Sequence, residues 1–283
     1  MEVRVEFDKL KQCYAQVNGV RLRYRYGGQG QPLVLLHGSP QTSLSWRKLV
    51  PLLSGDHTIV IPDLRGYGSS DRPATGYGIF TITEDVHQLV QHLDLGVVDL
   101  VGHDLGGLVA YAYAAQHMSE VRKLAVLEAP ILGVPSTSLE PVLSGYWHFG
   151  LYAHPRLPEI LIAGREHAYL SEFFRTYSHI DAIEAEALDE YARHLAAPGG
   201  IAGLVGAYRE IAGDLPALDR LTKKKLTMPV WAVGGDKSMG RGPFEQFQSL
   251  ADRVCGGVIH SSGHWVIEEQ PAQVAKELNV FLR

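Results

Sequence analysis

VDLVGHDLGGLVAYAY, residues 98–113, is the stretch that decides the fold. The short apolar run Val98–Val101 leads into a Gly-rich turn around Asp104, and an apolar helical pattern follows. Strand, tight turn and helix in this order are the context of a nucleophile elbow, although Asp stands here in place of the usual Ser. Such a turn needs small residues two positions either side of the nucleophile, and Gly102 and Gly106 supply them. We interpret Asp104 as a nucleophile; a helix N-cap is the alternative role.

The following helix supports the same interpretation of the turn. The N-terminus of a helix favours negative charge, so Asp104 is expected to stay ionised and able to attack.

Strand and helix patterns alternate on both sides of this turn. Asn18-Gly19 lies between two alternating segments and predicts an antiparallel hairpin. Helical patterns cover 81–93, with Thr81 and Glu84 as a capping box, and 105–117. The runs that predict buried parallel strands are Pro32–Leu36, His57–Ile61, Val98–Val101, Lys123–Leu127 and Pro229–Val233. The sequence therefore predicts an α/β fold with a mostly parallel, doubly wound sheet.

The strand patterns stop in the second half of the chain. From residue 132 to 215 helical stretches are broken by Pro155, Pro158 and the Pro-Gly-Gly of 198–200. An all-helical insertion predicts a cap over the sheet edge where ligands of such folds bind. The predicted division is a core of 1–131 and 216–283 and a helical cap of 132–215.

Composition excludes several classes of protein. With 46% hydrophobic and 20% charged residues in 283, the chain can bury a large core, and its net charge of −5 gives no nucleic-acid footprint. Cys13 and Cys255 are too few for a disulfide framework, and nothing places these two cysteines at metal-ligand spacing. The charged start lacks the apolar stretch of a secretory signal, and no run is long enough for a membrane span. We expect a cytoplasmic protein without nucleic-acid partner, metal or organic cofactor.

A base and an acid complete the predicted site. His264, in Ser-Gly-His-Trp of 262–265, follows the last predicted strand and precedes the final helix. In folds with such a nucleophile turn, the nucleophile, the acid and the His follow one another in this order along the chain, so His264 is at the position of the general base. Two carboxylates compete to orient it. Glu128 ends the strand after the nucleophile helix, and Asp236 follows the next strand. Glu128 is favoured, because the register of the second loop puts Lys237 at the more usual position of the acid.

The segment His-Gly-Ser-Pro of 37–40 follows the first parallel strand. In this position the fold supplies one backbone N–H of an oxyanion hole, so the amides of Ser39 and Leu105 are the predicted donors. A simple turn rich in Gly and Pro is the alternative interpretation.

The segments 37–40, 102–106 and 263–265 together resemble the α/β-hydrolase-fold epoxide hydrolases, over essentially the whole chain. Haloacid and haloalkane dehalogenases share this core. The resemblance implies that Asp104 opens an epoxide to form an alkyl ester, and that water activated by His264 cleaves the ester to a vicinal diol. The implied partners are a small epoxide and water. The oligomeric state is left open, with a homodimer among the options.

The resemblance also implies cap donors for the epoxide oxygen. Most members use two Tyr; here Tyr208 resembles the second, and His148 stands in place of the first. A His/Tyr pair with Glu128 as the acid is similar to the Cif-type bacterial epoxide hydrolases. Those enzymes are secreted, and the start of this sequence lacks a signal, so a secreted role is not carried over. Aromatic residues here could instead pack the cap against the core.

Two rival functions stay open. Fluoroacetate dehalogenases place Arg directly after the nucleophile and again three residues later, where this chain has Leu105 and Leu108. They also have Trp in place of Phe149, and haloalkane dehalogenases have Trp in place of Leu105. A non-catalytic receptor on the same fold is the other rival. The predicted apolar pocket residues are Leu105, Leu108, Trp46, Phe149 and Trp265, of which Phe149 and Trp265 are expected to contact substrate.

Overall fold

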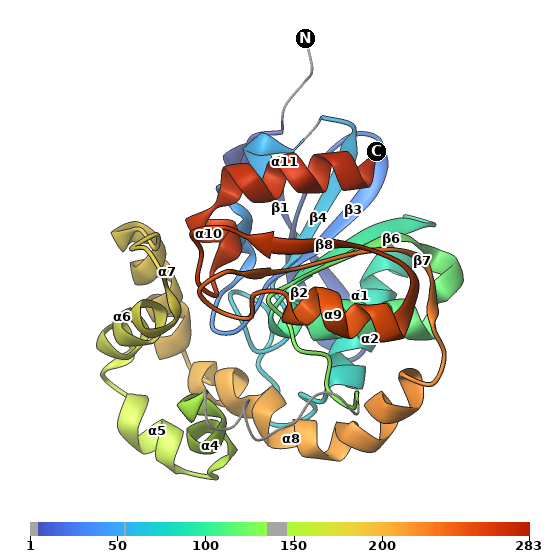
Figure 1. Ribbon diagram of the computed structural model, residues 1–283. Helices are drawn as coiled ribbons and strands as arrows, with labels where there is room; N and C mark the ends of the chain where they lie inside the picture. Colours follow the sequence, from blue (N-terminus) through green and yellow to red (C-terminus); the bar gives the residue numbers. More distant parts are fainter. Residues whose placement is uncertain (1–4, 54, 135–145) are drawn as a thin grey trace.

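A computed structural model describes residues 5–53, 55–134 and 146–283 of the chain. Its strands form one sheet in the order β1-β2-β4-β3-β5-β6-β7-β8 (Figure 1). β1 and β2 form an antiparallel pair, as do β2 and β4, and every later pair is parallel. The strands are β1 Lys11–Val17, β2 Val20–Gly28, β3 Gln31–Leu36, β4 His57–Pro62, β5 Val98–His103, β6 Val121–Leu127, β7 Leu226–Gly235 and β8 Ala251–Ile259. The mostly parallel sheet and the α/β-hydrolase fold class are confirmed.

The predicted hairpin and all five predicted runs lie where the sequence placed them. Val17 pairs with Val20 across Asn18-Gly19, and both turn residues have positive φ, 43° and 77°, as the tight hairpin turn requires. The edge strand β8 had not been predicted. Its sequence carries Asp252, Arg253 and a Gly pair, and four of its nine residues are exposed, so the apolar signal of a buried strand is missing.

Helices cover both faces of the sheet (Figure 1). One face carries α1 Ile79–His92, α2 Leu105–Gln116 and α9 Gly242–Leu250, whose apolar side chains join one core cluster. The other carries α10 Val266–Glu269 and α11 Pro271–Leu282, which join a second cluster. Short 3-10 turns are η1 Phe7–Lys9, η2 Ser43–Trp46, η3 Val50–Leu52 and η4 Met118–Glu120. All six residues of the central strand β5 are buried because both of its faces are covered.

The described residues of the segment between β6 and β7 form helices joined by loops and contain no strand. The helices are α4 Trp147–Ala153, α5 Leu157–Ile162, α6 Glu166–Tyr177, α7 Ala185–Ala196 and α8 Gly200–Leu221, which gather beside one end of the sheet (Figure 1). These helices have an apolar cluster of their own, joined by Trp265 from the last loop. Residues 135–145 of the predicted cap lie outside the described residues. The predicted boundary at 215 falls inside α8, so the domain division stays a prediction.

Helix α1 begins differently from the prediction. Its first residue is Ile79, not Thr81, and no side-chain hydrogen bond caps it from Gly78, so the predicted capping box is wrong. The first amides are satisfied instead by α8: Glu210 accepts from the Gly78 N–H at 2.7 Å and Asp214 from the Ile79 N–H at 2.6 Å. Anions at a helix N-terminus are stabilising, and here they come from a distant helix.

Two glycines make the turn between β5 and α2 sterically feasible. A Cβ on Gly102 would lie 2.2 Å from the carbonyl oxygen of Gly106, and one on Gly106 would lie 2.3 Å from that of Leu36. Both distances are far below van der Waals contact, and the blocking atoms are backbone.

We predict that Gly106→Ala destabilises the protein by about 3 kcal/mol or more, because the backbone must move to admit the methyl group. The matched control is Gly213→Ala, in α8, where nothing lies within 4 Å of an added Cβ. Alanine should there stabilise by about 0.5–1 kcal/mol, since a helical Gly is replaced. Urea unfolding of both variants measures the difference; equal effects would contradict the steric account.

Candidate active site

Asp104 lies at the turn between β5 and α2, with φ 51° and ψ −121°. A non-Gly residue at positive φ costs about 1–3 kcal/mol, and such strain often marks a functional position. Asp104 occupies the N-cap position of α2, but no side-chain capping bond is formed. Its Oδ1 instead accepts a hydrogen bond of 2.8 Å from the backbone N–H of Ser39, in the loop after β3. The carboxylate is therefore held toward the loop after β3 and lines a cavity there.

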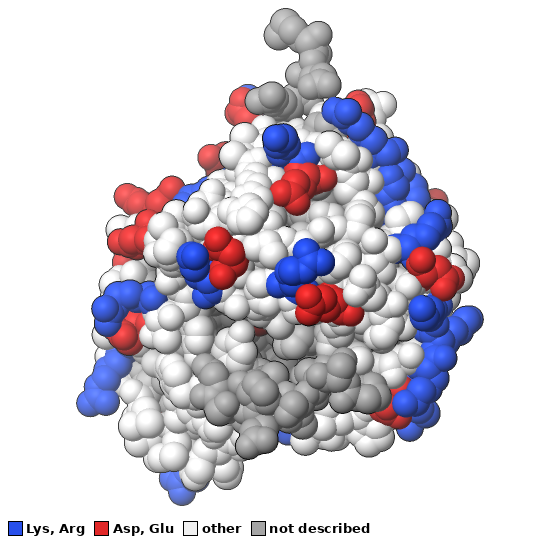
Figure 2. All heavy atoms as spheres, viewed as in Figure 1, with Lys and Arg blue, Asp and Glu red and all other residues white. Residues whose placement is uncertain are grey.

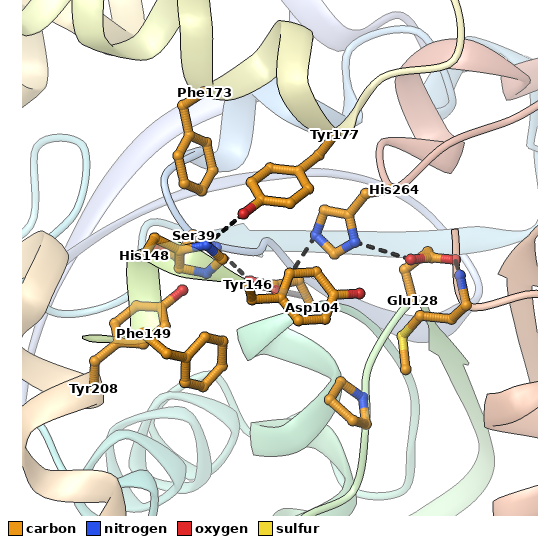
Figure 3. A pocket seen from close by; sticks show the side chains of 12 residues that line it. Ser39, Asp104, Glu128, Tyr146, His148, Phe149, Phe173, Tyr177, Tyr208 and His264 are labelled. Carbon is orange, nitrogen blue, oxygen red and sulfur yellow. Dashed lines mark hydrogen bonds and ion pairs between the residues drawn. The ribbon is translucent and has the colours of Figure 1, made fainter. Parts of the chain in front are cut away.

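His264 faces the other oxygen of this carboxylate. Its Nε2 lies 3.5 Å from Asp104 Oδ2, and its Nδ1 lies 2.9 Å from Glu128 Oε2. The backbone N–H of His264 donates to the carbonyl of Tyr177 at 2.9 Å, which links the His loop to α6. The imidazole thus lies between two carboxylates that come from the ends of β5 and β6 (Figure 3).

Glu128 is held rigidly behind His264. It follows β6 with φ 50° and is fully buried. Oε1 accepts from the Gly235 N–H at 2.6 Å and the Met239 N–H at 3.2 Å, while Oε2 accepts from the Ser238 hydroxyl at 2.8 Å. Buried carboxylates need such donors, and these come from the end of β7 and the loop after it.

The second candidate acid lies outside this arrangement. Asp236 accepts a hydrogen bond of 3.2 Å from the Ser262 N–H and pairs with Lys237 and His260 at 3.7 and 3.8 Å. It closes the loop around the strand ends without touching His264. The geometry therefore brings Glu128, and not Asp236, against the imidazole.

The pairing of opposite charges shifts the pKa values of Asp104 and His264 in opposite directions. Burial alone would raise the pKa of Asp104, but hydrogen bonding and attraction by His264 outweigh it and lower the pKa to about 2. Burial would lower the pKa of His264, but hydrogen bonds and attraction from Asp104 and Glu128 raise it to about 10. The resting site is therefore an imidazolium between two carboxylates.

A cavity opens above Asp104 toward the helical segment. The lining residues are Ser39, Asp104, Glu128, Pro130, Tyr146, His148, Phe149, Phe173, Tyr177, Tyr208, Met239 and His264. Aromatic rings with a few polar groups directed between them are a lining typical of a small-molecule site. His148 from α4 and Tyr208 from α8 lie close together in its wall, with ring centroids 5.6 Å apart and planes at 83° (Figure 3). Both predicted cap donors are thus brought to the same cavity as Asp104.

His148 has a partner that the sequence did not reveal. Its Nδ1 lies 2.9 Å from the hydroxyl of Tyr177, on α6. Burial lowers the pKa of His148 to about 4 and raises the pKa of Tyr177 to about 12, so both groups are neutral at pH 7. In sequence, Phe173 and Tyr177 are an aromatic pair at helical spacing, which is typical of core packing and gives no functional signal.

A second hollow adjoins the first. It shares Asp104, Pro130, Phe149 and Tyr208 with the first, and its other lining residues are Leu105, Leu108, Leu132, Ala207 and Ile211. Leu105, Leu108 and Phe149 therefore lie at apolar walls beside Asp104, as expected.

Two predicted pocket residues lie elsewhere. Trp265 is fully buried, and its indole N–H donates to the Phe174 carbonyl at 3.1 Å, so it packs the helical segment onto the core and does not line either hollow. Trp46 belongs to the core cluster on the α11 face. Both large rings are fully buried in apolar clusters, where they contribute to packing. The expected contact of Trp265 with substrate is therefore not supported by its position.

Comparison with known proteins identifies the family. Residues 31–156 match the family model described as "alpha/beta hydrolase fold". The soluble epoxide hydrolase of Corynebacterium sp. (strain C12) is 34% identical over 91% of this chain and 92% of its own. The chain belongs to the α/β-hydrolase family. This α/β-hydrolase is also similar to the solved structure of the epoxide hydrolase CorEH, with a TM-score of 0.91 and 33% identity over 97% of this chain and 100% of that one.

A relative with another name is also similar to this α/β-hydrolase. The fluoroacetate dehalogenase of a Burkholderia species is 28% identical over 98% of this chain and 95% of its own. The comparisons therefore support a hydrolytic enzyme of this family, and the choice of substrate has to be argued from the site.

The surface gives two further observations. Among the described residues, no helix of this α/β-hydrolase is long and apolar enough to cross a membrane. On the face drawn in Figure 2, Lys and Arg side chains are mixed with Asp and Glu side chains over the described residues.

The raised pKa of His264 can be tested directly. In Glu128→Gln one of the two carboxylates that stabilise the imidazolium is neutralised, so the pKa of His264 should fall from about 10 toward the ordinary value for His. Asp236→Asn, which changes the other nearby acid, should leave it unchanged. NMR titration of the imidazole measures both; an equal fall in the two variants would contradict the assignment of Glu128.

Proposed function

We propose that the protein is an epoxide hydrolase that works through an ester on Asp104. The observation that carries this proposal is the arrangement around one carboxylate. Oδ1 accepts from Ser39, Oδ2 faces His264, and the cavity above is walled by two neutral donors, His148 and Tyr208. Similarity to soluble epoxide hydrolases supports the same conclusion.

In the first step Asp104 Oδ2 attacks a ring carbon of the epoxide. The new C–O bond forms as the ring C–O bond breaks, and the electron pair goes to the departing oxygen. His148 and Tyr208 donate hydrogen bonds to that oxygen as its charge develops. Burial and the nearby Asp104 charge raise the pKa of Tyr208 well above its ordinary value, so the phenol keeps its proton for this role. As the ring opens, Tyr208 passes its proton to that oxygen. The phenol is then reprotonated by the proton that His264 releases after ester formation, and His264 regains a proton from the attacking water in the second step, so the site returns to its starting protonation state.

Ester formation prepares the second step by removing charge. Once Asp104 is esterified, only Glu128 remains to raise the pKa of His264, which falls and frees the imidazole to act as a base. Nε2 then takes a proton from the water that attacks Asp104 Cγ. The N–H groups of Ser39 and Leu105 stabilise the oxyanion, and Glu128 stabilises the imidazolium. Cleavage releases a vicinal diol and regenerates the carboxylate.

Tyr177 sets the tautomer of His148 in this proposal. A neutral imidazole carries one N–H, and which nitrogen bears it depends on the partner of the other. If the Tyr177 hydroxyl donates to Nδ1 across 2.9 Å, the proton of His148 is on Nε2 and available to the epoxide oxygen. Tyr177 is then a positioning residue that acts through His148.

Dehalogenation is the competing function, supported by the Burkholderia relative and by the shared Asp nucleophile. A haloacid carries a carboxylate that needs cations in a buried site. Among the described residues lining the two hollows there is no Lys or Arg, and Leu105 and Leu108 form apolar walls. These walls favour an uncharged substrate. Cytoplasmic location and oligomeric state stay predictions.

Trapping the ester distinguishes these functions. In His264→Gln the first step should proceed and the second should stop, so intact-mass spectrometry after incubation with terminal epoxides should show an adduct of the whole epoxide mass. His264→Gln combined with Asp104→Asn is the control and should show none. An adduct only from haloacids, with halide lost, would make the protein a dehalogenase. No adduct from either class would favour the receptor.

The cap donors give a second test. His148→Phe and Tyr208→Phe should each lower kcat/KM by about 10²-fold, because one hydrogen bond to the developing oxyanion is lost. Tyr177→Phe should lower kcat less, with KM nearly unchanged, since Nε2 is then protonated only part of the time. The control is Tyr169→Phe, which lies on α6 like Tyr177 but is not among the residues that line the cavity. Full activity of both donor variants would contradict their role.

A further inference from the structure

We propose that Glu84, His87 and His117 form a binding site for a divalent transition-metal ion, of which Zn²⁺ is the best match. The site lies between α1 and the end of α2, which pack side by side, and it is separate from the active site (Figure 1). The proposal is independent of the function proposed above.

The three side chains converge from two helices. Glu84 and His87 are three residues apart on α1 and lie on one face of it, while His117 directly follows α2. One ligand atom from each residue lies within 4.8 Å of the others. The rings of His87 and His117 are stacked, with centroids 3.8 Å apart and planes at 15°. Two imidazoles and a carboxylate are a ligand set that suits Zn²⁺.

The spacing around His87 fits an ion better than a hydrogen bond. Both of its ring nitrogens are buried and make no hydrogen bond to any residue that the structure describes. The carboxylate oxygens near them are Glu84 Oε2, 3.7 Å from Nδ1, and Glu120 Oε2, 3.4 Å from Nε2. Hydrogen bonds of this kind measure about 2.7–3.2 Å. Two ligands of a tetrahedral zinc at about 2.0–2.1 Å each are about 3.3 Å apart, and the 3.7 Å between His87 Nδ1 and Glu84 Oε2 is close to that separation.

Outer contacts orient the carboxylates, as around known metal ligands. The amide of Gln88 donates to Glu84 Oε1 at 2.6 Å, and the hydroxyl of Tyr113 donates to Glu120 Oε2 at 2.9 Å. Glu84 offers a negative charge as a ligand, and Glu120 places a second negative charge beside the cluster, 3.4 Å from His87 Nε2. Glu84, His87 and His117 are each partly exposed, so the cluster lies near the surface, and a turn of the His87 side chain would open its nitrogens to an ion that keeps a water as a further ligand.

The position implies a structural role. Asp104 precedes α2 and His117 follows it, and a helix of 12 residues is about 18 Å long. An ion here cannot touch the reacting atoms. It would instead cross-link α1 to the end of α2 and stabilise the folded state by mass action.

The test uses the full chain after chelator treatment, with ZnCl₂ as the titrant. Calorimetry should show one equivalent bound, and at about 100-fold excess over Kd the melting temperature should rise by about 5 °C. CoCl₂ should give the visible absorption of a tetrahedral site. His87→Gln and His117→Gln should lose the shift and the absorption. His92→Gln, an exposed residue at the end of the same helix, is the matched control and should retain both.

The same variants distinguish loss of the metal site from misfolding and from binding at a different place in the protein. Circular dichroism and the melting temperature without metal establish that each variant is folded. Zinc binding that is equal in all variants would place the ion elsewhere, for example at His264, and would overturn the proposal. Absence of binding to the unmodified chain would overturn it as well and would leave the cluster as a set of ion pairs.

Discussion

The strained turn at Asp104 is the constraint on which the rest of the site depends. Gly102 and Gly106 let the end of β5 and the start of α2 approach within contact of the β3 end, so that the carboxylate meets the Ser39 amide. Because the same sheet edge carries Glu128 and the loop of His264, fixing this turn fixes the distances among the side chains of Asp104, His264 and Glu128. The sheet thus holds the backbone of Asp104 in an unfavourable conformation and, with it, fixes the position of the Asp104 carboxylate.

Charge balance then links the two chemical steps that we propose. An imidazolium between two carboxylates is a stable resting state, and it also keeps Asp104 ionised. Removing the charge of Asp104 changes the proton affinity of its neighbour without any movement of the backbone. In this proposal, the charges of Asp104, His264 and Glu128 determine that ester formation precedes the activation of water.

Much of this could be predicted because the signals are local. The hairpin at Asn18-Gly19, the turn around Asp104 and the loop of His264 each depend on a few consecutive residues. The choice between Glu128 and Asp236 needed the packing of two loops. The start of α1 is set by α8, about 130 residues away, and Tyr177 and Trp265 are ordinary aromatic positions until the fold places them. β8 was missed because an exposed edge strand has no apolar pattern.

The carboxylates that α8 gives to α1 have a further consequence for the choice of substrate. Tyr208 lies on α8 only two residues from Glu210, which accepts from the backbone beside α1, so this wall is anchored to the core. His148 lies on the seven-residue helix α4, which packs mainly on α5 and α8. One side of the cavity is therefore anchored directly to the core, and the other is held mainly by neighbouring helices. Changes in specificity among such enzymes should accumulate on the α4 side, where the scaffold tolerates them at little expense to stability.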